Sequence, residues 1–412
     1  MNLSIFRAFH SRNYRLYFTG QSLSLIGTWM QRTAVYWVIY AKTDSAFMLG
    51  AAVFAAQFPS FLFSPLGGVI SDRYNRYRVL LVTQTASMIQ AILLAVLVLF
   101  NQYTVWEILS LSVLLGLINA FDVPARQSMI LELISNKEDL PNAIALNSSM
   151  VNLAWMIGPA ISGIVLAQLG AGLCFLINAV SFLAVLVSLM MMKFPKFIRP
   201  VRTKKVMTEF KEGWQYLRRT PSIGVIILLL ACVSLLITPF STLLPVYAKV
   251  LFKGDASTFG YLNSFIGLGA AGGALFLASL RGGVNLRKFL IINVLIFGTG
   301  LILFSQMTNF PAALFFAVIA GFGMMSQTTI SNTLVQTTSS PEMRGRVISY
   351  FAMAFFGMQP LGGLLVGTLS QHIGARNTIL AEGIAAVIIV LLFLPYLKKD
   401  MLPKKETQTY TK

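Results

Sequence analysis

Charged residues are scarce in this chain, since Asp, Glu, Lys and Arg make up only 11% of its 412 residues. A soluble domain carries about 25% of such residues, because its surface has to face water. Hydrophobic residues make up 56% of the chain, and the mean hydropathy is +0.73. This composition excludes a water-soluble globular protein and predicts a membrane protein with the lipid bilayer as a partner.

Cysteine and histidine are also rare, with two residues of each. Cys174 and Cys232 lie far apart in or beside apolar runs, with no CxxC motif and no clustered histidines. We therefore expect neither a disulfide framework nor a metal site. The sequence has no Walker A motif, no paired carboxylates in its apolar runs and no nucleophile beside a histidine. This predicts that the protein is not an enzyme and needs no cofactor, and that the proton gradient drives any transport.

Acidic residues number 14 against 32 Lys and Arg, which gives a net charge of +18. In a soluble protein this excess would indicate nucleic-acid binding. Here the basic residues lie in short loops between apolar runs, which is the positive-inside pattern of membrane proteins. We therefore expect no nucleic-acid partner.

Twelve apolar runs are long enough to cross a bilayer core of about 30 Å, which needs roughly 20 residues per helix. The runs are 15–40, 46–70, 78–100, 105–130, 142–168, 172–193, 222–248, 257–280, 287–308, 311–335, 345–370 and 377–397. The two chain ends and alternate loops, with the edges of the runs beside them, hold 26 of the 32 Lys and Arg; the other loops hold four, and Arg32 and Arg126 lie further inside runs. This asymmetry places both termini in the cytoplasm, and we expect a multi-pass protein of a bacterial inner membrane.

One long polar segment divides the runs into two sets of six. We expect a six-helix bundle at 1–193, a cytoplasmic basic linker at 194–221, a second six-helix bundle at 222–397 and a cytoplasmic tail at 398–412. The linker is either a basic tether or forms a short amphipathic helix over Val206–Arg219 on the membrane surface.

The two halves repeat a glycine and proline pattern. The fifth run contains Gly158, Pro159 and Gly163, and the eleventh run contains Pro360, Gly362 and Gly363 at a similar place. Glycine thins a helix and proline bends it, so this pattern predicts close helix packing where the halves meet. A general helix-packing role is the alternative.

The loop after the second run reads Gly-Val-Ile-Ser-Asp-Arg-Tyr-Asn-Arg from Gly68 to Arg76. Gly68 permits a close helix approach, and Asp72 can accept hydrogen bonds at a helix N-terminus. Arg73 and Arg76 can pair with acids of neighbouring helices. We interpret the loop as a cytoplasmic gate, with a merely positive loop as the alternative.

This loop resembles the signature of the major facilitator superfamily. The stretches Phe18–Gly27, Asn119–Arg126 and Asn142–Ser148 resemble its enterobactin-exporter-like branch, the transmembrane secretion effectors, and the similarity covers nearly the whole chain. The resemblance implies an all-α fold of 12 transmembrane helices in two six-helix bundles. It also implies that Glu132 is the acid partner in the gate, and that the first and fourth helices of each half line a central cavity.

Four ionisable side chains within the runs stand out: Arg32, Asp122, Arg126 and Glu382. A charge at mid-bilayer is costly, so such a side chain faces a cavity or a partner. We predict that Asp122, together with Arg126, couples transport to protons, because burial favours the protonated carboxyl. A structural ion pair between these two residues is the alternative. Glu382 lies near the outer end of the last run, where we expect a structural role.

Polar residues on the faces expected to line the cavity are the candidate substrate ligands. Gln21, Thr28 and Arg32 share one face of the first helix at about 100° per residue. The full set is Gln21, Thr28, Arg32, Asn119, Asn152, Asn263 and Gln327. The second half is richer in Phe and Met than in charge, which favours a wall for amphipathic ligands.

These features predict a secondary active transporter that works by alternating access. We expect a monomer that exports amphipathic small molecules, siderophore-like or drug-like, in exchange for protons. An importer or a lipid or lysophospholipid translocator on the same scaffold is the first alternative, since fold alone does not decide the substrate. A non-transporting membrane sensor is the second.

Overall fold

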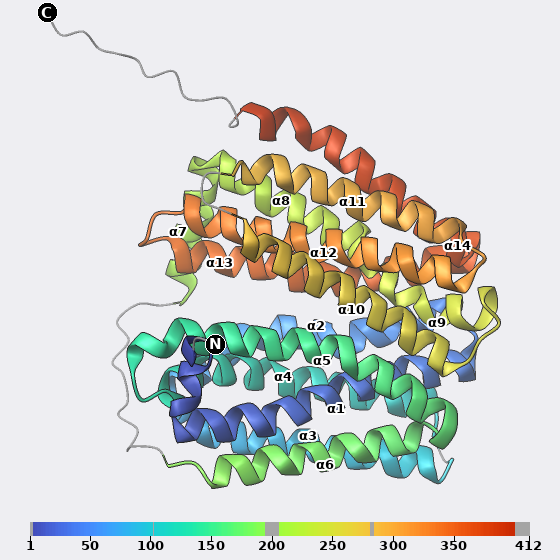
Figure 1. Cartoon of the computed structure of the whole chain (residues 1–412), viewed down its shortest axis with the longest axis horizontal. Coiled ribbons are helices and arrows are strands. Elements are labelled where there is room, and N and C mark those ends of the chain that lie inside the picture. Colours follow the sequence, from blue (N-terminus) through green and yellow to red (C-terminus); the bar gives the residue numbers. More distant parts are fainter. Residues whose placement is uncertain (1–2, 102, 194–205, 281–283, 400–412) are drawn as a thin grey trace, which may run out of the picture.

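The computed structural model describes residues 3–101, 103–193, 206–280 and 284–399, and these residues form helices with no strand among them (Figure 1). The first set is η1 (Leu3–His10), α1 (Arg12–Thr43), α2 (Ala46–Arg73), α3 (Arg76–Leu99), α4 (Val105–Leu133), η2 (Lys137–Asp139), α5 (Leu140–Leu169) and α6 (Ala171–Met190). The helix α7 (Val206–Arg219) follows. The second set is α8 (Pro221–Leu236), η3 (Thr238–Leu243), α9 (Leu244–Val246), η4 (Tyr247–Leu251), α10 (Ala256–Ser279), α11 (Leu286–Gln306), α12 (Phe310–Thr338), α13 (Arg344–Ala352), η5 (Met353–Gly357) and α14 (Met358–Lys399).

Helix starts and breaks follow local residue chemistry. Thr104 and Glu107 form a reciprocal capping box at the start of α4, which satisfies backbone N–H groups that lack a partner in the first turn. Gly170 separates α5 from α6 with φ +83°, and Gly374 breaks α14 with φ +81°. Glycine adopts such left-handed angles without steric cost. The two halves therefore turn in the same way between their last two long helical segments.

Ten helical segments in the described part of the chain are long and apolar enough to cross a membrane. The last of them, Arg344–Leu397, has 54 residues and contains the break at Gly374. Since about 20 residues cross a bilayer, this segment has the length for two crossings. α1 has 32 residues but is more polar than the others. The chain is thus an all-helical, multi-pass membrane protein.

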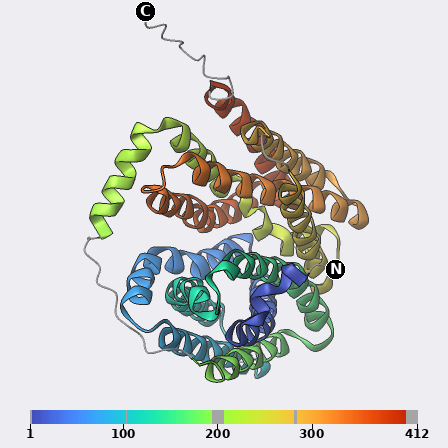
Figure 2. The same ribbon diagram turned by 60° about the vertical axis from the view of Figure 1, so that its left-hand side comes forward.

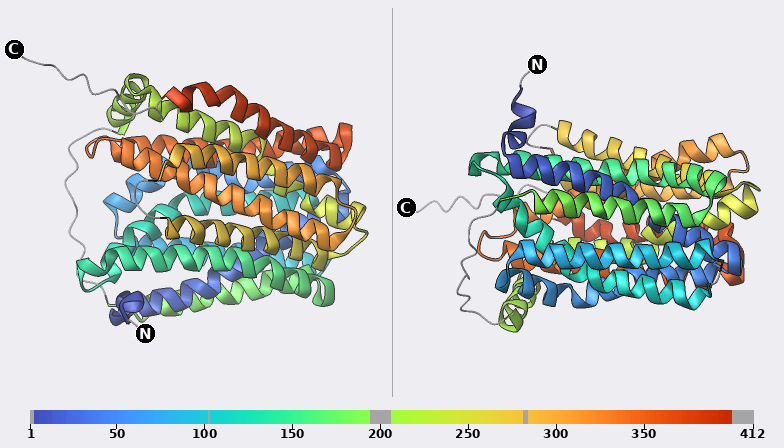
Figure 3. Two further views of the ribbon diagram at one scale, coloured as in Figure 1. Left: turned by 45° about the horizontal axis from the view of Figure 1, so that its top comes forward. Right: turned by 90° about the horizontal axis from the view of Figure 1, so that it is seen from below.

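The helices form two groups. α1–α6 pack on one another, and so do α8 and α10–α14; we call these groups the first and the second half (Figure 2). The halves meet mainly along two helix pairs, α5 with α10 and α2 with α14. Figure 3 shows that the long helices lie side by side with their axes roughly aligned. Successive loops therefore lie at opposite ends of the molecule.

We name the two ends by their loops. The basic end holds η1, α7 and the start of α13, while the short-loop end holds α9 and the turns at Gly170 and Gly374 (Figure 1). Of the two interpretations of the linker, the structure shows the helix, α7. It lies against α13, where Glu212 pairs with Arg346 at 2.7 Å and Trp214 contacts Tyr350 at 6.1 Å between ring centroids.

Candidate functional site

Glycines bring the halves into backbone contact. A Cβ added to Gly163 of α5 would lie 2.9 Å from the carbonyl oxygen of Ala256, and one added to Gly260 of α10 would lie 2.8 Å from Gly163 Cα. On the other helix pair, Gly50 of α2 faces the backbone of Gly363 in α14. Side chains larger than hydrogen do not fit these crossings without backbone shifts.

The short-loop end also carries polar contacts across the halves. Lys249 of η4 pairs with Asp44 at 2.6 Å, and Gln371 Nε2 donates to Ser45 Oγ at 2.6 Å. Asp44 and Ser45 belong to the first half, whereas Lys249 and Gln371 belong to the second. Together with the glycine crossings, these contacts hold the halves together at this end.

The basic end carries an ion pair within the first half. Arg76 Nη1 binds Glu132 Oε1 at 2.5 Å, and Arg76 Nε donates to the carbonyl of Ser71 at 3.3 Å. Glu132, the acid implied by the family resemblance, is thus the partner of Arg76. Arg73 is the last residue of α2 and is exposed, and the side chain of Asp72 lies outside the described residues.

The close approach predicted at Gly68 is wrong by one residue. A Cβ added to Gly68 would meet nothing within 4 Å, whereas Gly67 lies against the carbonyl of Ala120 in α4. The physical reason is helical phase: neighbouring residues differ by about 100°, so only one of two adjacent glycines faces α4.

Asp122 is buried, with 3% of its surface exposed, and sits in a hydrogen-bonded cluster. Its Oδ1 accepts from Thr83 Oγ1 at 2.8 Å and from Gln84 Nε2 at 2.7 Å, both on α3. Its Oδ2 lies 3.4 Å from Arg126 Nε. The side chain of Asp122 therefore links α3 to Arg126 of its own helix. Asp122 and Arg126 are brought together inside the first half.

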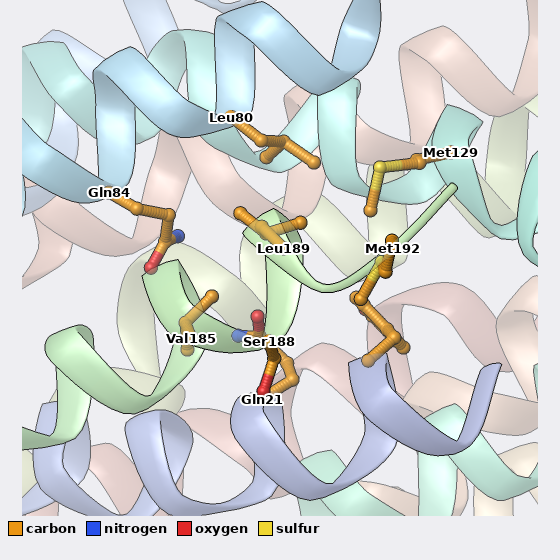
Figure 4. A pocket seen from close by; sticks show the side chains of 9 residues that line it. Gln21, Leu80, Gln84, Met129, Val185, Ser188, Leu189 and Met192 are labelled. Atoms are coloured by element: carbon orange, nitrogen blue, oxygen red, sulfur yellow. The ribbon is translucent and has the colours of Figure 1, made fainter. Parts of the chain in front are cut away.

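Gln21 lies beside this cluster and apart from the rest of its predicted stripe. It lines a small cavity between α1, α3, α4 and α6, as do Tyr17 and Gln84 (Figure 4). The cavity has a volume of about 10 Å³, which is room for about one water molecule. Gln21 therefore contributes to a polar core of the first half, at a site too small for a substrate.

Arg32 lies among aromatic rings. Its Nε donates to Tyr36 Oη at 3.0 Å, and its guanidinium carbon is 5.1 Å from the centroid of Trp29. Trp29 stacks in turn on Trp155 of α5 at 5.9 Å. Among the described residues no acid forms an ion pair with Arg32. Thr28, by contrast, donates to the carbonyl of Ser24 within its own helix.

The remaining cavity candidates are spread over four helices. Asn119 on α4 and Asn152 on α5 are half-buried. Asn263 of α10 donates to the carbonyl of Phe259 at 3.3 Å. Gln327 of α12 is fully buried and donates to Thr328 Oγ1 at 2.8 Å, while its own carbonyl oxygen has no partner among the described residues.

The glycine and proline pattern serves two kinds of contact. Gly158 packs on Trp29 inside the first half, and Gly362 packs on Leu235 inside the second. Gly163 and Gly363 instead pack across the halves. Pro159 and Pro360 are buried beside them. Both halves therefore use an inner glycine and a crossing glycine in the same order.

Sequence analysis missed an amide ladder in the first half. Asn178 Nδ2 donates to Gln31 Oε1 at 2.8 Å, Gln31 Nε2 donates to Gln90 Oε1 at 2.9 Å, and Gln90 Nε2 donates to the Leu111 carbonyl at 3.1 Å. These hydrogen bonds join α6, α1, α3 and α4. Amides inside apolar runs were a usable signal, because buried amides need partners.

Glu382 differs from this ladder. Its side chain is 4% exposed, and neither carboxyl oxygen has a hydrogen-bond partner among the described residues. Within the same part of the chain, no three His, Cys, Asp or Glu residues are grouped as metal ligands would be.

The helical arrangement is that of the major facilitator fold. A mutant of the nucleoside transporter NupG superposes with a TM-score of 0.76 over 93% of this chain and 98% of that protein, at 10% sequence identity. At this identity the likeness shows the fold alone. The fold defines a multi-pass membrane protein of the major facilitator type.

A family model described as transmembrane secretion effector matches residues 3–410, and the chain belongs to this family. The staphyloferrin A transporter of Staphylococcus aureus is 26% identical over 393 residues, which cover 92% of this chain and 95% of that protein. The multidrug efflux pump Tap of Mycolicibacterium fortuitum is 24% identical over 90% of this chain and 92% of the pump. The predicted family is confirmed, and with it the prediction that the chain is a transporter and not an enzyme.

Proposed function

We propose that this protein is a proton-coupled exporter of amphipathic small molecules that works by alternating access. The observation that carries the proposal is the position of the contacts between the halves. Glycine crossings, the Asp44–Lys249 pair and the Ser45–Gln371 hydrogen bond gather toward the short-loop end, while the pairs at the basic end lie within one half or join α7 to α13. Breaking the first set would let the halves rock apart at that end.

In this proposal the chain crosses the membrane twelve times. α1 supplies one, and Gly374 divides the segment Arg344–Leu397 into two. Because most Lys and Arg lie at the basic end, this end faces the cytoplasm of a bacterial inner membrane. The protein would then act as a monomer, closed to the outside and open to the cytoplasm.

The substrate class follows from Arg32 and its aromatic neighbours. A guanidinium forms forked hydrogen bonds to anionic or carbonyl groups, and Trp29, Tyr36 and Trp155 offer apolar faces beside it. A compound with both features, such as a siderophore or an amphipathic drug, matches this surface. The relatives support the same class, since one is a staphyloferrin A transporter and the other a multidrug efflux pump.

Proton coupling in this proposal involves the pair Asp122 and Arg126. Protonation of Asp122 would weaken its contact with Arg126 and release a permanent positive charge four residues further along α4. Thr83 and Gln84 fill Oδ1, so the proton would bind at Oδ2 in place of the contact with Arg126. The pair would therefore change its partners as the helices move.

Transport in inverted vesicles tests the proposal. Vesicles holding the wild-type protein receive an imposed pH gradient and a panel of siderophores, dyes and antibiotics. We expect uphill accumulation of at least one compound, lost when the gradient is collapsed, and weakened by Asp122→Asn. Flux of none of the compounds would contradict export, whereas equilibration of labelled lysolipid without a gradient would support a translocator instead.

A further inference from the structure

Glu382 is a buried carboxyl group without a partner. Both of its oxygens are enclosed, and none of the described residues donates to them. A buried carboxylate without donors or a counter-ion is strongly unfavourable. The arrangement described here therefore suits the neutral, protonated side chain.

The internal repeat shows what this position does in the first half. Asn178 lies seven residues after Ala171, which follows the turn at Gly170, and Glu382 lies seven residues after Ala375, which follows the turn at Gly374. Asn178 is the α6 member of the amide ladder and is fully hydrogen-bonded to neighbours on α1 and α6. At the matching place the second half has a titratable group and no ladder.

A second buried polar group of the second half belongs to a π-helical turn. The hydroxyl of Tyr247 is likewise buried without a partner among the described residues. Its ring stacks at 5.0 Å between centroids on Phe304 of α11, the helix that packs against α14. Tyr247 begins the π-helix η4, and Lys249 lies two residues further on. Lys249 forms the ion pair with Asp44 that joins the halves. π-helical turns occur often at functional sites because their hydrogen bonding is easily rearranged.

Other charged groups near Glu382 are few. Arg376 lies six residues before it, or about 9 Å along the helix, and donates to Gln306 at the short-loop end. The packed helix α8 carries Cys232 as its titratable group, and α11 carries Arg287 and Lys288 at its opposite end. α2 likewise carries Asp72 and Arg73 at the basic end, and η3 and η5 carry none.

We propose that Glu382 is a proton-binding site that controls the short-loop end through Tyr247 and the Lys249–Asp44 pair. With its proton bound, Glu382 is neutral and the halves stay closed at this end. When the proton leaves to water, the carboxylate attracts the Tyr247 hydroxyl, η4 rearranges, and Lys249 separates from Asp44. The place of this step in an export cycle rests on the proposed function, but the proton site itself does not.

Infrared difference spectroscopy of the purified full-length protein tests the proton site, with the proton as the only ligand. A pH step should change a carboxylic acid C=O band in the wild type, and Glu382→Gln should remove that change. Asp122→Asn serves as the control for the other buried acid and should leave the Glu382 band in place. An unchanged band in Glu382→Gln would overturn the proposal.

Spin-label distances test the link to the short-loop end. Labels at Gln168→Cys and Thr308→Cys, both exposed positions in opposite halves, are placed in a protein with Cys174→Ala and Cys232→Ala. Raising the pH should lengthen the distance in the wild type, and Glu382→Gln should keep it short at every pH. Asp44→Asn should lengthen it at every pH. Equal pH responses in Glu382→Gln and the wild type would contradict the link.

A conservative variant covers the case in which Glu382→Gln does not fold. Glu382→Asp retains the carboxyl and should keep both the infrared change and the pH-dependent distance. Loss of both in well-folded Glu382→Asp would count against a carboxyl proton site. Neither measurement uses a transported compound, so a failed export assay alongside a positive result here would refute the proposed function alone.

Discussion

The two halves share a backbone plan but treat buried polar groups differently. In the first half, Asp122 has three donors and the amide ladder joins four helices. In the second half, buried polar atoms without a partner among the described residues occur on several elements: Ser234, Tyr247, Ser264, Asn293, Ser326, Gln327, Ser331, Ser370 and Glu382. Only two such atoms, on Gln57 and Gln84, lie in the described part of the first half.

This difference has a mechanical meaning. A satisfied network has a large cost of rearrangement, because each broken bond leaves a buried group unpaired. Unsatisfied groups lose nothing when their helices shift, and they gain whatever partner or water the new arrangement brings. We therefore expect rearrangement to cost more in the first half, where the Asp122–Arg126 pair is the proposed exception, than in the second half with Glu382 and the π-helical turn.

The largest expected effect comes at the crossing glycines, where the halves are alike. Gly50→Ala in the first half and Gly260→Ala in the second should each disfavour the closed short-loop end by about 1–3 kcal/mol of overpacking. This corresponds to about a 5- to 150-fold shift in population and a comparable loss of flux in vesicles. Gly272→Ala, on the same helix as Gly260 but with only one atom at 3.9 Å from the added Cβ, is the matched control. Equal flux in Gly260→Ala and Gly272→Ala would show that the crossing is not needed.

The next effect concerns stability, which should change in opposite directions when a buried polar residue is replaced by leucine in each half. Asn178→Leu removes a ladder member and leaves Gln31 short of a donor, so it should lower stability by about 1–3 kcal/mol. Glu382→Leu removes a carboxyl group that has no partner, so it should leave stability equal or higher. Thermal unfolding of both purified proteins in one detergent checks the signs. Equal destabilisation by both substitutions would remove the contrast between the halves.

A smaller effect is expected at the basic end. Glu132→Gln cuts the pair with Arg76, and Glu212→Gln cuts the pair between α7 and Arg346. Partly exposed ion pairs contribute roughly 0–1 kcal/mol, so flux should change only a few-fold in either variant. Glu212→Gln should also speed proteolytic cleavage within α7, whereas Glu132→Gln should not. Identical cleavage rates would show that the pair does not hold α7.

The smallest effect concerns the caps at the short-loop end. Asp255 caps α10 in the second half, and Ser45 caps α2 in the first. The Ser257 hydroxyl, which donates to Asp255, lowers the pKa of that carboxyl, although partial burial opposes the shift. A lowered pKa in the folded state stabilises the protein above the unfolded-state pKa, and this contribution disappears as the pH falls through the folded value.

The expected difference between the wild type and Asp255→Asn is therefore about 0.3–1 kcal/mol near neutral pH and vanishes in acid. Thermal unfolding at a series of pH values measures it, and Ser45→Asn should show no such pH dependence. A difference that persists unchanged at acid pH would mean that the Asp255 charge does not contribute.

Much of the fold follows from the sequence, because long apolar runs and the placement of Lys and Arg are direct consequences of the bilayer. The ion pair between Arg76 and Glu132 was anticipated from the loop motif, because the family pattern includes an acid partner for the loop. The direction in which a single residue points from its helix was harder to predict from the sequence. The close helix approach was therefore assigned to Gly68, and the structure places it at Gly67.

Two assignments depended on tertiary packing that no local pattern contains. Gln21 shares a helical face with Arg32, yet it points into a cavity within the first half. Glu382 was expected to have a structural role near the outer end of the last run, but it is buried, with 4% of its surface exposed, and has no hydrogen bond among the described residues. The burial of a polar side chain and the residues that pack around it, rather than its residue type, decide its role.

Gradient-driven flux in Glu382→Gln tests the central claim, which is that the response to the pH gradient needs Glu382 in the second half as well as Asp122 in the first. Wild-type and variant proteins are reconstituted in the same vesicles with one transported compound, and uphill and downhill flux are measured with and without a pH gradient. We predict that Glu382→Gln keeps downhill equilibration and loses its response to the gradient. A variant that accumulates the compound as fully as the wild type would contradict the account.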